Sequence, residues 1–304
     1  MLSCGLNWLS GVGSHMRFTD YYNQANPAIS FELFPPKTKK AENDLEANLP
    51  RLIDLSPDFF TVTYGALGTT RDGTLKLASK LKIDYNVEVA HHLTCVALNK
   101  DQLDTALAEI KSQGINKIVA IRGDIPQGES RFKPPVGGYS YANEMVRHIK
   151  EFDDQFSIAV AGYPEKHIEA SDFDFDIRNL KRKVEAGAEI VITQLFYDNN
   201  DFYRFQDRCQ KIGINVPIIA GLMPILSTNQ IVRISSMCGA KIPHSLMQKL
   251  DKAGDNLQLI REIGIEHAIN QANDLLYQGV SGIHFYVLNQ RFHIAEIMES
   301  LRKQ

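Results

Sequence analysis

An acidic residue interrupts an apolar run near the start of the sequence. Glu32 lies within residues 30–34 (SFELF), and two prolines follow directly. A carboxylate in such a run is costly to bury unless it is hydrogen-bonded or takes part in chemistry. Burial raises the pKa of a carboxyl group, and a raised pKa suits the group to general acid catalysis. We therefore predict that Glu32 is a general acid; the alternative is a structural carboxylate that pairs with a neighbouring residue.

Arg122, Gly123 and Asp124 form a second candidate group, directly after the β-rich run 117–121. A guanidinium group binds a phosphate or a carboxylate well, and a glycine lets a ligand approach the backbone closely. We interpret these residues as a candidate site for an anionic ligand. The alternative is a salt bridge within a loop.

A third group lies in a segment of helical period. Asp176, Asn179 and Lys183 are three and four residues apart, which places their side chains on one face of a helix. Such a face could hold ribose and phosphate groups near the start of the helix. The alternative is a solvated helix face with no ligand.

Two adjacent histidines, His91 and His92, lie in another β-rich run. Neighbouring side chains of a strand point to opposite faces, so one of the two faces inward. We predict a functional role for His92; the alternative is a hydrogen-bonded core histidine. The four cysteines are scattered without a CxxC pair, so the sequence indicates neither a metal site nor a disulfide framework.

Short apolar runs and segments of helical period alternate along the chain. The runs predicted as strands are 29–34, 59–64, 87–95, 117–121, 157–161, 190–194, 217–221 and 282–287. The segments predicted as helices are 44–55, 73–81, 101–112, a helix from 141, 176–186, 201–212, a broken stretch over 228–278, and 292–302. Eight such units predict an α/β fold, a single-domain (β/α)8 TIM barrel whose chemistry lies at the carboxyl-terminal strand ends. A doubly wound sheet is the alternative, but no GxGxxG fingerprint follows the first strand.

Composition excludes several classes of protein. The chain has 304 residues, with 33 Lys and Arg against 36 Asp and Glu, so its net charge of −3 argues against a nucleic-acid binder. No apolar run reaches the roughly 20 residues of a membrane span, and the cysteine usage favours the cytoplasm. We predict a loosely packed leader over 1–28, in which 13–16 (GSHM) is a tag remnant or a coincidence, and a catalytic domain over 29–304.

A series of motifs covers almost everything after residue 28. They are SFELFPPK at 30–37, VTYGA at 62–66, HLTC at 92–95, AIRGD at 120–124, YPEKH at 163–167, NLKRKVEAGA at 179–188, ITQLF at 192–196, GLMP at 221–224 and HFYVLN at 284–289. In this order the motifs resemble methylenetetrahydrofolate reductases of the bacterial type. The resemblance implies a flavoprotein that passes a hydride from NADH or NADPH through FAD to 5,10-methylenetetrahydrofolate. The product, 5-methyltetrahydrofolate, supplies methionine synthesis, and the kinetics are ping-pong.

The same resemblance implies roles for individual residues. Glu32 is the general acid that opens the folate ring to an iminium cation, Asp124 lies near the flavin pyrimidine edge, and Gln194 contacts the folate. The implied FAD-binding residues are Thr63, Tyr64, His92, Arg122, Gly123, Asp124, Tyr141, Ala142, Ala161, Tyr163, His167, Asp176, Asn179 and Lys183. The implied substrate-binding residues are Glu32, Gln194, Gln230, Ile234, Tyr286 and Arg291. A homo-oligomer is also implied.

The sequence departs from the family pattern at two positions. Ile234 stands where the family often has an aromatic residue that packs on the substrate. Gln290 stands where many members have an arginine for the folate tail, and Arg291 follows it. A long C-terminal regulatory domain is not expected, nor is inhibition by S-adenosylmethionine. The alternatives are another FAD barrel enzyme, such as a proline dehydrogenase, and a flavin- or folate-binding protein without turnover.

Overall fold

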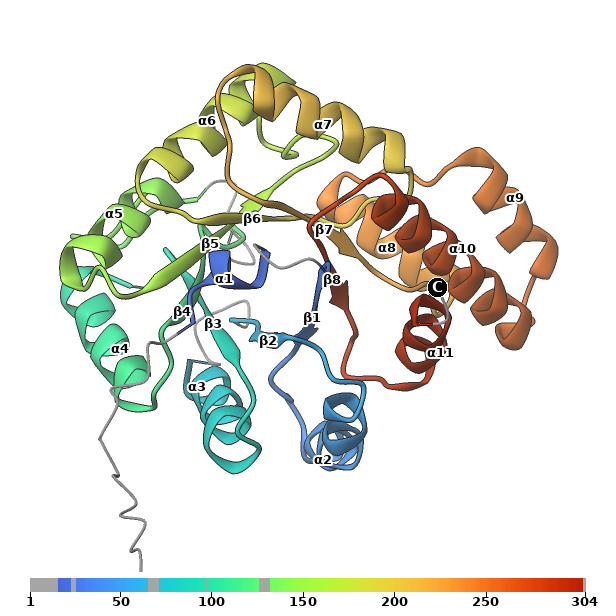
Figure 1. Cartoon of the computed structure of the whole chain (residues 1–304), viewed down its shortest axis with the longest axis horizontal. Coiled ribbons are helices and arrows are strands. Elements are labelled where there is room, and N and C mark those ends of the chain that lie inside the picture. Colours follow the sequence, from blue (N-terminus) through green and yellow to red (C-terminus); the bar gives the residue numbers. More distant parts are fainter. Residues whose placement is uncertain (1–15, 23–25, 65–70, 97, 126–131, 303–304) are drawn as a thin grey trace, which may run out of the picture.

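The computed structural model describes residues 16–22, 26–64, 71–96, 98–125 and 132–302. Within these ranges eight parallel strands close into a barrel, each strand hydrogen-bonded to the next one along the chain and the last to the first (Figure 1). The strands are β1 (Ala28–Leu33), β2 (Phe59–Val62), β3 (Val89–Thr94), β4 (Lys117–Ile121), β5 (Ser157–Gly162), β6 (Ile190–Thr193), β7 (Ile218–Leu222) and β8 (Gly282–Tyr286). The predicted barrel fold is confirmed.

Helices surround the barrel and alternate with its strands (Figure 1). They are α1 (Phe18–Tyr22), α2 (Lys39–Ile53), α3 (Arg71–Ser79) with the π-helix η1 (Lys80–Asp84), α4 (Lys100–Ser112), α5 (Ala142–Phe152), α6 (Phe173–Glu185), α7 (Asn199–Lys211), α8 (Thr228–Cys238), α9 (His244–Ala253), α10 (Leu257–Tyr277) and α11 (Phe292–Leu301). None of the helices in the described ranges is long and apolar enough to cross a membrane.

Capping residues explain where the helices differ from the sequence prediction. The first helix of the barrel begins at Lys39 instead of 44, because Thr38 accepts a hydrogen bond from the backbone N–H of Ala41. In the same way Asp172 caps α6 through Phe175, so α6 begins three residues before Asp176. Asp176 therefore lies in the first turn of α6, with its side chain beside the helix start.

The broken stretch over 228–278 consists of three helices, α8, α9 and α10. Gly239 ends α8 in the left-handed region at φ +77°, a conformation that L side chains adopt only with strain. Gly254 follows α9 with φ +55°. These two glycines divide a segment whose apolar pattern alone reads as one interrupted helix.

Most of the residues that line the inside of the barrel at the amino-terminal ends of its strands are apolar. Ala28, Phe59, Ala90, Val119 and Ile190 belong to one buried cluster together with side chains of α1. A larger cluster between the strands and the surrounding helices forms the main core. The interior of the barrel is therefore filled at this end. Two polar side chains are also buried there, Lys117 at the start of β4 and Ser157 at the start of β5.

Helix α1 closes the amino-terminal end of the barrel. Phe18 is fully buried and its ring centroid lies 5.4 Å from that of Phe59, while Tyr21 lies 5.0 Å from the same ring. The prediction of a loosely packed leader is therefore wrong for α1, because burial of its two aromatic rings fixes it in place. Residues 1–15 lie outside the described part of the chain.

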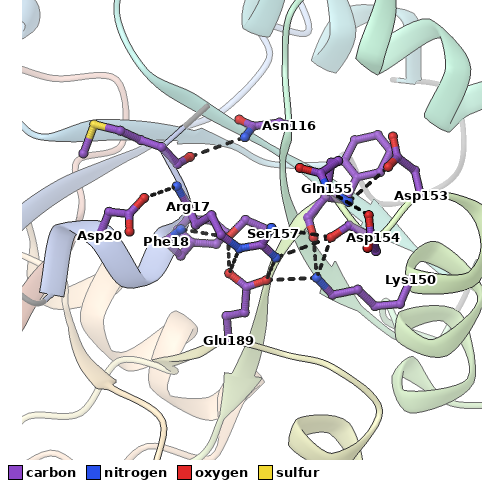
Figure 2. Close-up of polar contacts among 12 residues, drawn as sticks. Arg17, Phe18, Asp20, Asn116, Lys150, Asp153, Asp154, Gln155, Ser157 and Glu189 are labelled. Atoms are coloured by element: carbon purple, nitrogen blue, oxygen red, sulfur yellow. Dashed lines mark hydrogen bonds and ion pairs between the residues drawn. The ribbon is translucent and has the colours of Figure 1, made fainter. Parts of the chain in front are cut away.

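Polar contacts fasten α1 to the barrel (Figure 2). Glu189, directly before β6, accepts hydrogen bonds from Arg17, from Lys150 at 2.9 Å and from the Ser157 hydroxyl at 2.5 Å. Ser157 in turn accepts from the backbone N–H of Phe18 at 2.7 Å. Burial raises the pKa of Glu189, but these donors outweigh it and lower the pKa below its ordinary value.

Candidate active site

Inward-facing polar side chains gather around Glu32 near the carboxyl-terminal strand ends. The register of the barrel sets Glu32 beside Thr61 of β2 and Tyr286 of β8. One carboxylate oxygen, Oε2, lies 3.3 Å from Nε2 of His284, 3.5 Å from Nε2 of His92 and 3.5 Å from Oγ1 of Thr61. Only 7% of Glu32 is exposed. The predicted burial of Glu32 is confirmed, and so is the inward orientation of His92.

The electrostatics of Glu32 differ from the sequence prediction. Burial is the strongest influence and raises the pKa of Glu32, but the hydrogen bond from His284, the charges of the two imidazoles and the contact with Thr61 together lower it below its ordinary value. Burial lowers the pKa of His92 to about 4, against the attraction of Glu32. The prediction of a raised pKa for Glu32 is therefore wrong for the ligand-free protein.

A cleft opens between the ends of β4 and β5 and the starts of α5 and α6, and none of the residues of the Glu32 cluster belongs to its lining. It has a volume of about 720 Å³, within the range of about 300–1,000 Å³ for small-molecule sites. The structure brings together in its lining the predicted cofactor residues Arg122, Tyr141, Ala142, Ala161, Tyr163, His167, Asp176, Asn179 and Lys183. Asp176, Asn179 and Lys183 all line this cleft, as expected for a shared site, and their role in binding a ligand stays a prediction.

Lys183 brings a positive charge deep into the cleft. Its ammonium group donates to the carbonyl oxygen of Ala161 and lies 5.7 Å from the ring centroid of Tyr163. Burial lowers the pKa of Lys183 to about 8, although the charge of Asp176 opposes this shift. Asp176 itself accepts a hydrogen bond from the backbone N–H of His167 at 2.9 Å, and burial raises its pKa. An anionic ligand group beside Lys183 would offset the cost of burying this ammonium.

Arg122 lines the same cleft and is held on two sides. Its guanidinium donates to both oxygens of Glu169, at 2.8 and 2.5 Å, and lies 5.2 Å from the ring centroid of Phe132. The hydrogen bonds from Arg122 to Glu169 raise the pKa of Arg122 further. Gly123 has φ +88°, and a Cβ there would meet Val96 at 2.7 Å, so local backbone geometry itself requires glycine.

The predicted substrate residues lie on the opposite side, around β6, β7 and β8. The hydroxyl of Tyr286 donates to the carbonyl oxygen of Thr193 at 2.7 Å, and the Tyr286 ring packs against Gly221 of β7. A Cβ on Gly221 would meet the same carbonyl oxygen at 2.1 Å and the Tyr286 ring at 2.9 Å. Gln194 follows Thr193 and its side-chain oxygen accepts from the backbone N–H of Leu195, which leaves its amide N–H groups for a ligand.

Two further predicted substrate residues lie on α8. Gln230 accepts a hydrogen bond from the backbone N–H of Leu226 at 2.7 Å. Ile234 packs, half-buried, against the apolar cluster that Tyr286 also joins. Ile234 and Tyr286 thus pack against the same apolar cluster.

The structure does not bring every predicted residue to the cleft. Thr63, Tyr64, Gly123 and Asp124 lie outside its lining, and Arg291 is exposed at the start of α11. Asp124 is an exposed side chain just after β4. His92 is also outside the lining and lies beside Glu32 instead. The roles of all the predicted site residues stay sequence predictions.

Sequence reasoning missed several residues at the site. The cleft is also lined by Phe132, Glu169, Phe175 and Arg182, and the Glu32 cluster includes Thr61 and His284. Helical spacing could have found Arg182, which lies three residues after Asn179 and donates to its side chain at 3.0 Å. His284 and Thr61 are set beside Glu32 by the closure of the barrel, which leaves no local signal in the sequence.

A closed barrel with a buried carboxylate and a cleft lined by charged side chains at the carboxyl-terminal ends of its strands defines the class of (β/α)8 proteins that bind a ligand at that end. A model of the methylenetetrahydrofolate reductase family matches residues 17–302. The chain therefore belongs to the methylenetetrahydrofolate reductase family, as its motifs predict.

Individual relatives agree with this assignment. The chain is 40% identical over 276 residues to methylenetetrahydrofolate reductase (NADH) 1 of Arabidopsis thaliana, covering 88% of this chain and 47% of that protein. It is 40% identical over 262 residues to 5,10-methylenetetrahydrofolate reductase of Escherichia coli, covering 86% of each. The chain thus spans about half the length of the plant relatives it matches.

One solved structure shares the fold over nearly its whole length. An uncharacterized protein from Clostridium thermocellum, which binds two copies of 5-methyl-5,6,7,8-tetrahydrofolic acid, has a TM-score of 0.64 and 16% identity. The match covers 94% of this chain and 97% of that one. At this level of identity the likeness concerns the fold alone.

Proposed function

We propose that this chain reduces 5,10-methylenetetrahydrofolate to 5-methyltetrahydrofolate, with NADH as the hydride donor and FAD as the bound cofactor. The observation that carries the proposal is Glu32, a buried carboxylate near the carboxyl-terminal strand ends of a barrel that also has a cleft lined by charged side chains, in a chain of this family. The names of the plant relatives, which specify NADH, support the choice of donor over NADPH. Donor and folate would use one site in turn, which implies ping-pong kinetics.

The residues of the cleft fit FAD. Lys183 and Arg182 supply positive charge for a diphosphate, while Arg122 is paired with Glu169, and Glu144 and Asp176 also line the cleft. Asn179 adds an amide that can bind a ribose hydroxyl. The small side chains of Ala142 and Ala161 leave space for a planar ring system beside the backbone. A long anionic ligand with an aromatic end therefore suits this lining better than a small amino acid.

Glu32 would act as the proton donor in folate reduction. Its carboxyl O–H bond breaks, an N–H bond forms on an amine nitrogen of the substrate, and the C–N bond of the five-membered ring breaks to leave an iminium cation. When bound, FAD would supply the hydride that it accepted from the nicotinamide, and the iminium carbon would become the methyl group. Glu32 then regains its proton from water.

Other residues would stabilise the cationic stage. Asp124 places a negative charge after β4, which favours a positively charged intermediate. Gln194 can donate to folate through the amide N–H groups that its contact with Leu195 leaves available. Ile234 and Tyr286 form an apolar wall against which a flat substrate ring could pack.

A general acid must carry a proton when it reacts, so the lowered pKa of Glu32 fits this role when substrate binding raises it. In the ligand-free protein the carboxylate is ionised at neutral pH. A substrate that covers the opening removes the remaining water from Glu32 and favours its neutral form. Substrate binding should therefore be accompanied by proton uptake at this carboxyl group.

A visible spectrum recorded during anaerobic additions tests the proposal. The protein loaded with FAD should be yellow, should bleach on addition of NADH, and should recover its colour on addition of 5,10-methylenetetrahydrofolate. A protein that bleaches with NADPH alone would overturn the choice of donor. A protein that never retains FAD would contradict the flavoenzyme proposal and would favour a folate-binding protein without turnover.

A further inference from the structure

The segment that follows β6 carries Gln194 and has no regular structure. Residues 194–198 connect β6 to α7 and lie in neither a strand nor a helix. Leu195 and Tyr197 are nevertheless buried, in the apolar cluster that also contains Ile225. Carbonyl groups in a buried irregular segment need hydrogen-bond partners from elsewhere, because no helix or sheet ladder supplies them. The partners of these carbonyl groups therefore decide how Gln194 is held.

Helix α10 supplies the partners for two of these carbonyl groups. Nε2 of Gln271 donates to the carbonyl oxygen of Phe196 at 3.2 Å, and Nε2 of His267 lies 3.1 Å from the carbonyl oxygen of Tyr197. A carbonyl oxygen only accepts hydrogen bonds, so Nε2 of His267 carries a hydrogen and donates it. Burial lowers the pKa of His267, which favours its neutral ring. His267 and Gln271 are four residues apart and thus share one face of α10.

Gln271 also holds the first residue of α7. Its amide nitrogen has two hydrogens, and it donates to Oδ1 of Asn199 at 3.2 Å as well as to Phe196. In return Nδ2 of Asn199 donates to the carbonyl oxygen of Gln271 at 3.0 Å and to Asp274 of α10 at 2.6 Å. Only 7% of Gln271 is exposed. The start of α7 is therefore fixed to α10 together with the segment before it.

The barrel holds the other end of the segment. The backbone N–H of Gln194 donates to the carbonyl oxygen of Gly162 at 2.8 Å, and Tyr286 binds the carbonyl group of Thr193. The side-chain oxygen of Gln194 accepts from the backbone N–H of Leu195 at 3.0 Å. A shift of the backbone at Leu195 would therefore turn the Gln194 amide, although the strand end before it stays in place.

We propose that Gln271 and His267 are positioning residues that act through the 194–198 segment to direct the amide of Gln194 toward the folate. This inference rests on the proposed function, in which Gln194 contacts the folate. Neither Gln271 nor His267 belongs to the lining of the cleft. Their effect on the substrate is therefore indirect and passes through the backbone of Phe196 and Tyr197.

The position of α10 itself does not depend on these two side chains. Gly264 lies on the same face, three residues before His267, and a Cβ there would clash with the carbonyl oxygen of Ile225 and lie 2.8 Å from its Cβ. Helix α10 thus packs closely against the segment between β7 and α8. Loss of the donor at position 267 or 271 should therefore move the 194–198 segment and leave the helix in place.

The test measures ligand binding in a double-mutant cycle. Gln271→Met and His267→Leu remove the donors, and His267→Gln keeps an amide N–H near the Nε2 position. Gln258→Met is the matched control, because Gln258 also lies on α10 but donates to the exposed Glu262 at 3.0 Å. Each change is made in the unaltered protein and in Gln194→Ala. Calorimetric titration of the FAD-loaded protein with 5-methyltetrahydrofolate gives the folate Kd, and fluorescence titration gives the FAD Kd.

The folate Kd should separate the variants. We expect it to rise about 10-fold in Gln271→Met and about fivefold in His267→Leu, the effect of losing one hydrogen bond to the ligand. His267→Gln and Gln258→Met should stay within about twofold of the unaltered protein. In Gln194→Ala, Gln271→Met should raise the Kd by less than about twofold, because the amide that it positions is gone. The FAD Kd should stay within about twofold throughout.

Three results would overturn the inference. The first is a folate Kd in Gln271→Met within about twofold of the unaltered protein, and the second is an undiminished effect of Gln271→Met in Gln194→Ala. The third is an equal rise of the FAD and folate Kd, which indicates a purely structural role. If Gln271→Met does not fold, the comparison of Leu with Gln at the half-buried position 267 decides. Failure of the proposed function looks different, because the unaltered protein itself would not bind 5-methyltetrahydrofolate.

Discussion

The two ends of the barrel each bury a carboxylate, and the two carboxylates have different partners. Glu189, at the amino-terminal end, is held by the permanent charges of Arg17 and Lys150 and by Ser157 (Figure 2). Glu32, at the carboxyl-terminal end, contacts imidazoles and a hydroxyl. Burial acts to raise the pKa of both groups and hydrogen bonding lowers both below their ordinary values.

The nature of the partners separates a structural carboxylate from one suited to proton transfer. Protonation of Glu189 would leave the buried part of two cations without a counter-charge, which is strongly unfavourable. Protonation of Glu32 leaves no lysine or arginine without a counter-charge, because its partners are two imidazoles and a hydroxyl, and burial lowers the pKa of one of them, His92, to about 4. Two buried carboxylates with pKa shifts of the same direction thus differ in whether they can gain a proton.

The sharpest test of this contrast is Glu32→Gln. We expect folate reduction to fall about 10³-fold, since a general acid contributes roughly 10²–10⁴-fold. Reduction of the flavin by NADH should stay within about threefold, because that step needs no proton from Glu32. Stopped-flow absorbance measures both rates; survival of both half-reactions would show that Glu32 is not the acid.

At the other end, Glu189→Gln should affect stability and leave chemistry unchanged. We expect the free energy of unfolding at pH 7 to fall by about 3 kcal/mol, because two cations lose their partner. Urea denaturation measures this change. Glu42→Gln is the control, since its exposed pairs with Lys39 and Lys76 should leave the denaturation midpoint unchanged.

The stability difference between Glu189→Gln and the unaltered protein should depend on pH. The pKa of Glu189 is lower in the folded than in the unfolded chain, so its contribution is fully present above the unfolded value of about 4.3. The contribution is lost as the pH falls through the folded pKa. The two proteins should therefore converge at acid pH, and a constant difference between pH 7 and pH 3 would contradict the assignment.

Two lysines provide a matched comparison between the ends. Lys183 and Lys150 each donate to a backbone carbonyl, of Ala161 and Phe156 respectively. Lys183→Met should weaken FAD binding about 30-fold, the loss of one charge-assisted hydrogen bond of about 2 kcal/mol. Lys150→Met should lower the unfolding free energy and leave the FAD Kd within twofold. Fluorescence titration measures the FAD Kd of both variants. Equal increases in Kd would show that the two lysines do not differ in their contribution to FAD binding.

The smallest expected effect concerns the apolar wall on α8. Ile234→Phe adds an aromatic face beside Tyr286, and we expect KM for NADH to fall about threefold. Val232→Phe, on an exposed position of the same helix, should leave KM unchanged. Steady-state kinetics distinguish the two; an unchanged KM in Ile234→Phe would mean that the nicotinamide binds elsewhere.

The barrel could be predicted because its signals are local. Alternating apolar runs and helical segments mark the strands and helices, and motifs such as AIRGD at 120–124 mark the strand ends. Helix α1 was missed because five residues are too short for a periodic pattern. Its place is set by Phe18 and Tyr21 packing on Phe59, a contact between distant segments.

The candidate site could be predicted in its members more than in its electrostatics. The apolar neighbours of Glu32 correctly indicated burial, but the sign of its pKa shift depends on His284, which lies 252 residues away in the sequence. The contact between Arg122 and Glu169 likewise joins two loops. Propensity and periodicity describe one segment at a time, so interactions that arise from barrel closure escape them.

The bond between Arg17 and Glu189 has a consequence for the order of folding. These residues are 172 positions apart, so the polar contacts that hold α1 are completed only after the chain through the start of β6 exists. During synthesis more than half of the chain is therefore made before α1 can be fixed by all its contacts at the amino-terminal end of the barrel. The N-terminal segment is thus expected to be among the last parts to become protected from hydrogen exchange.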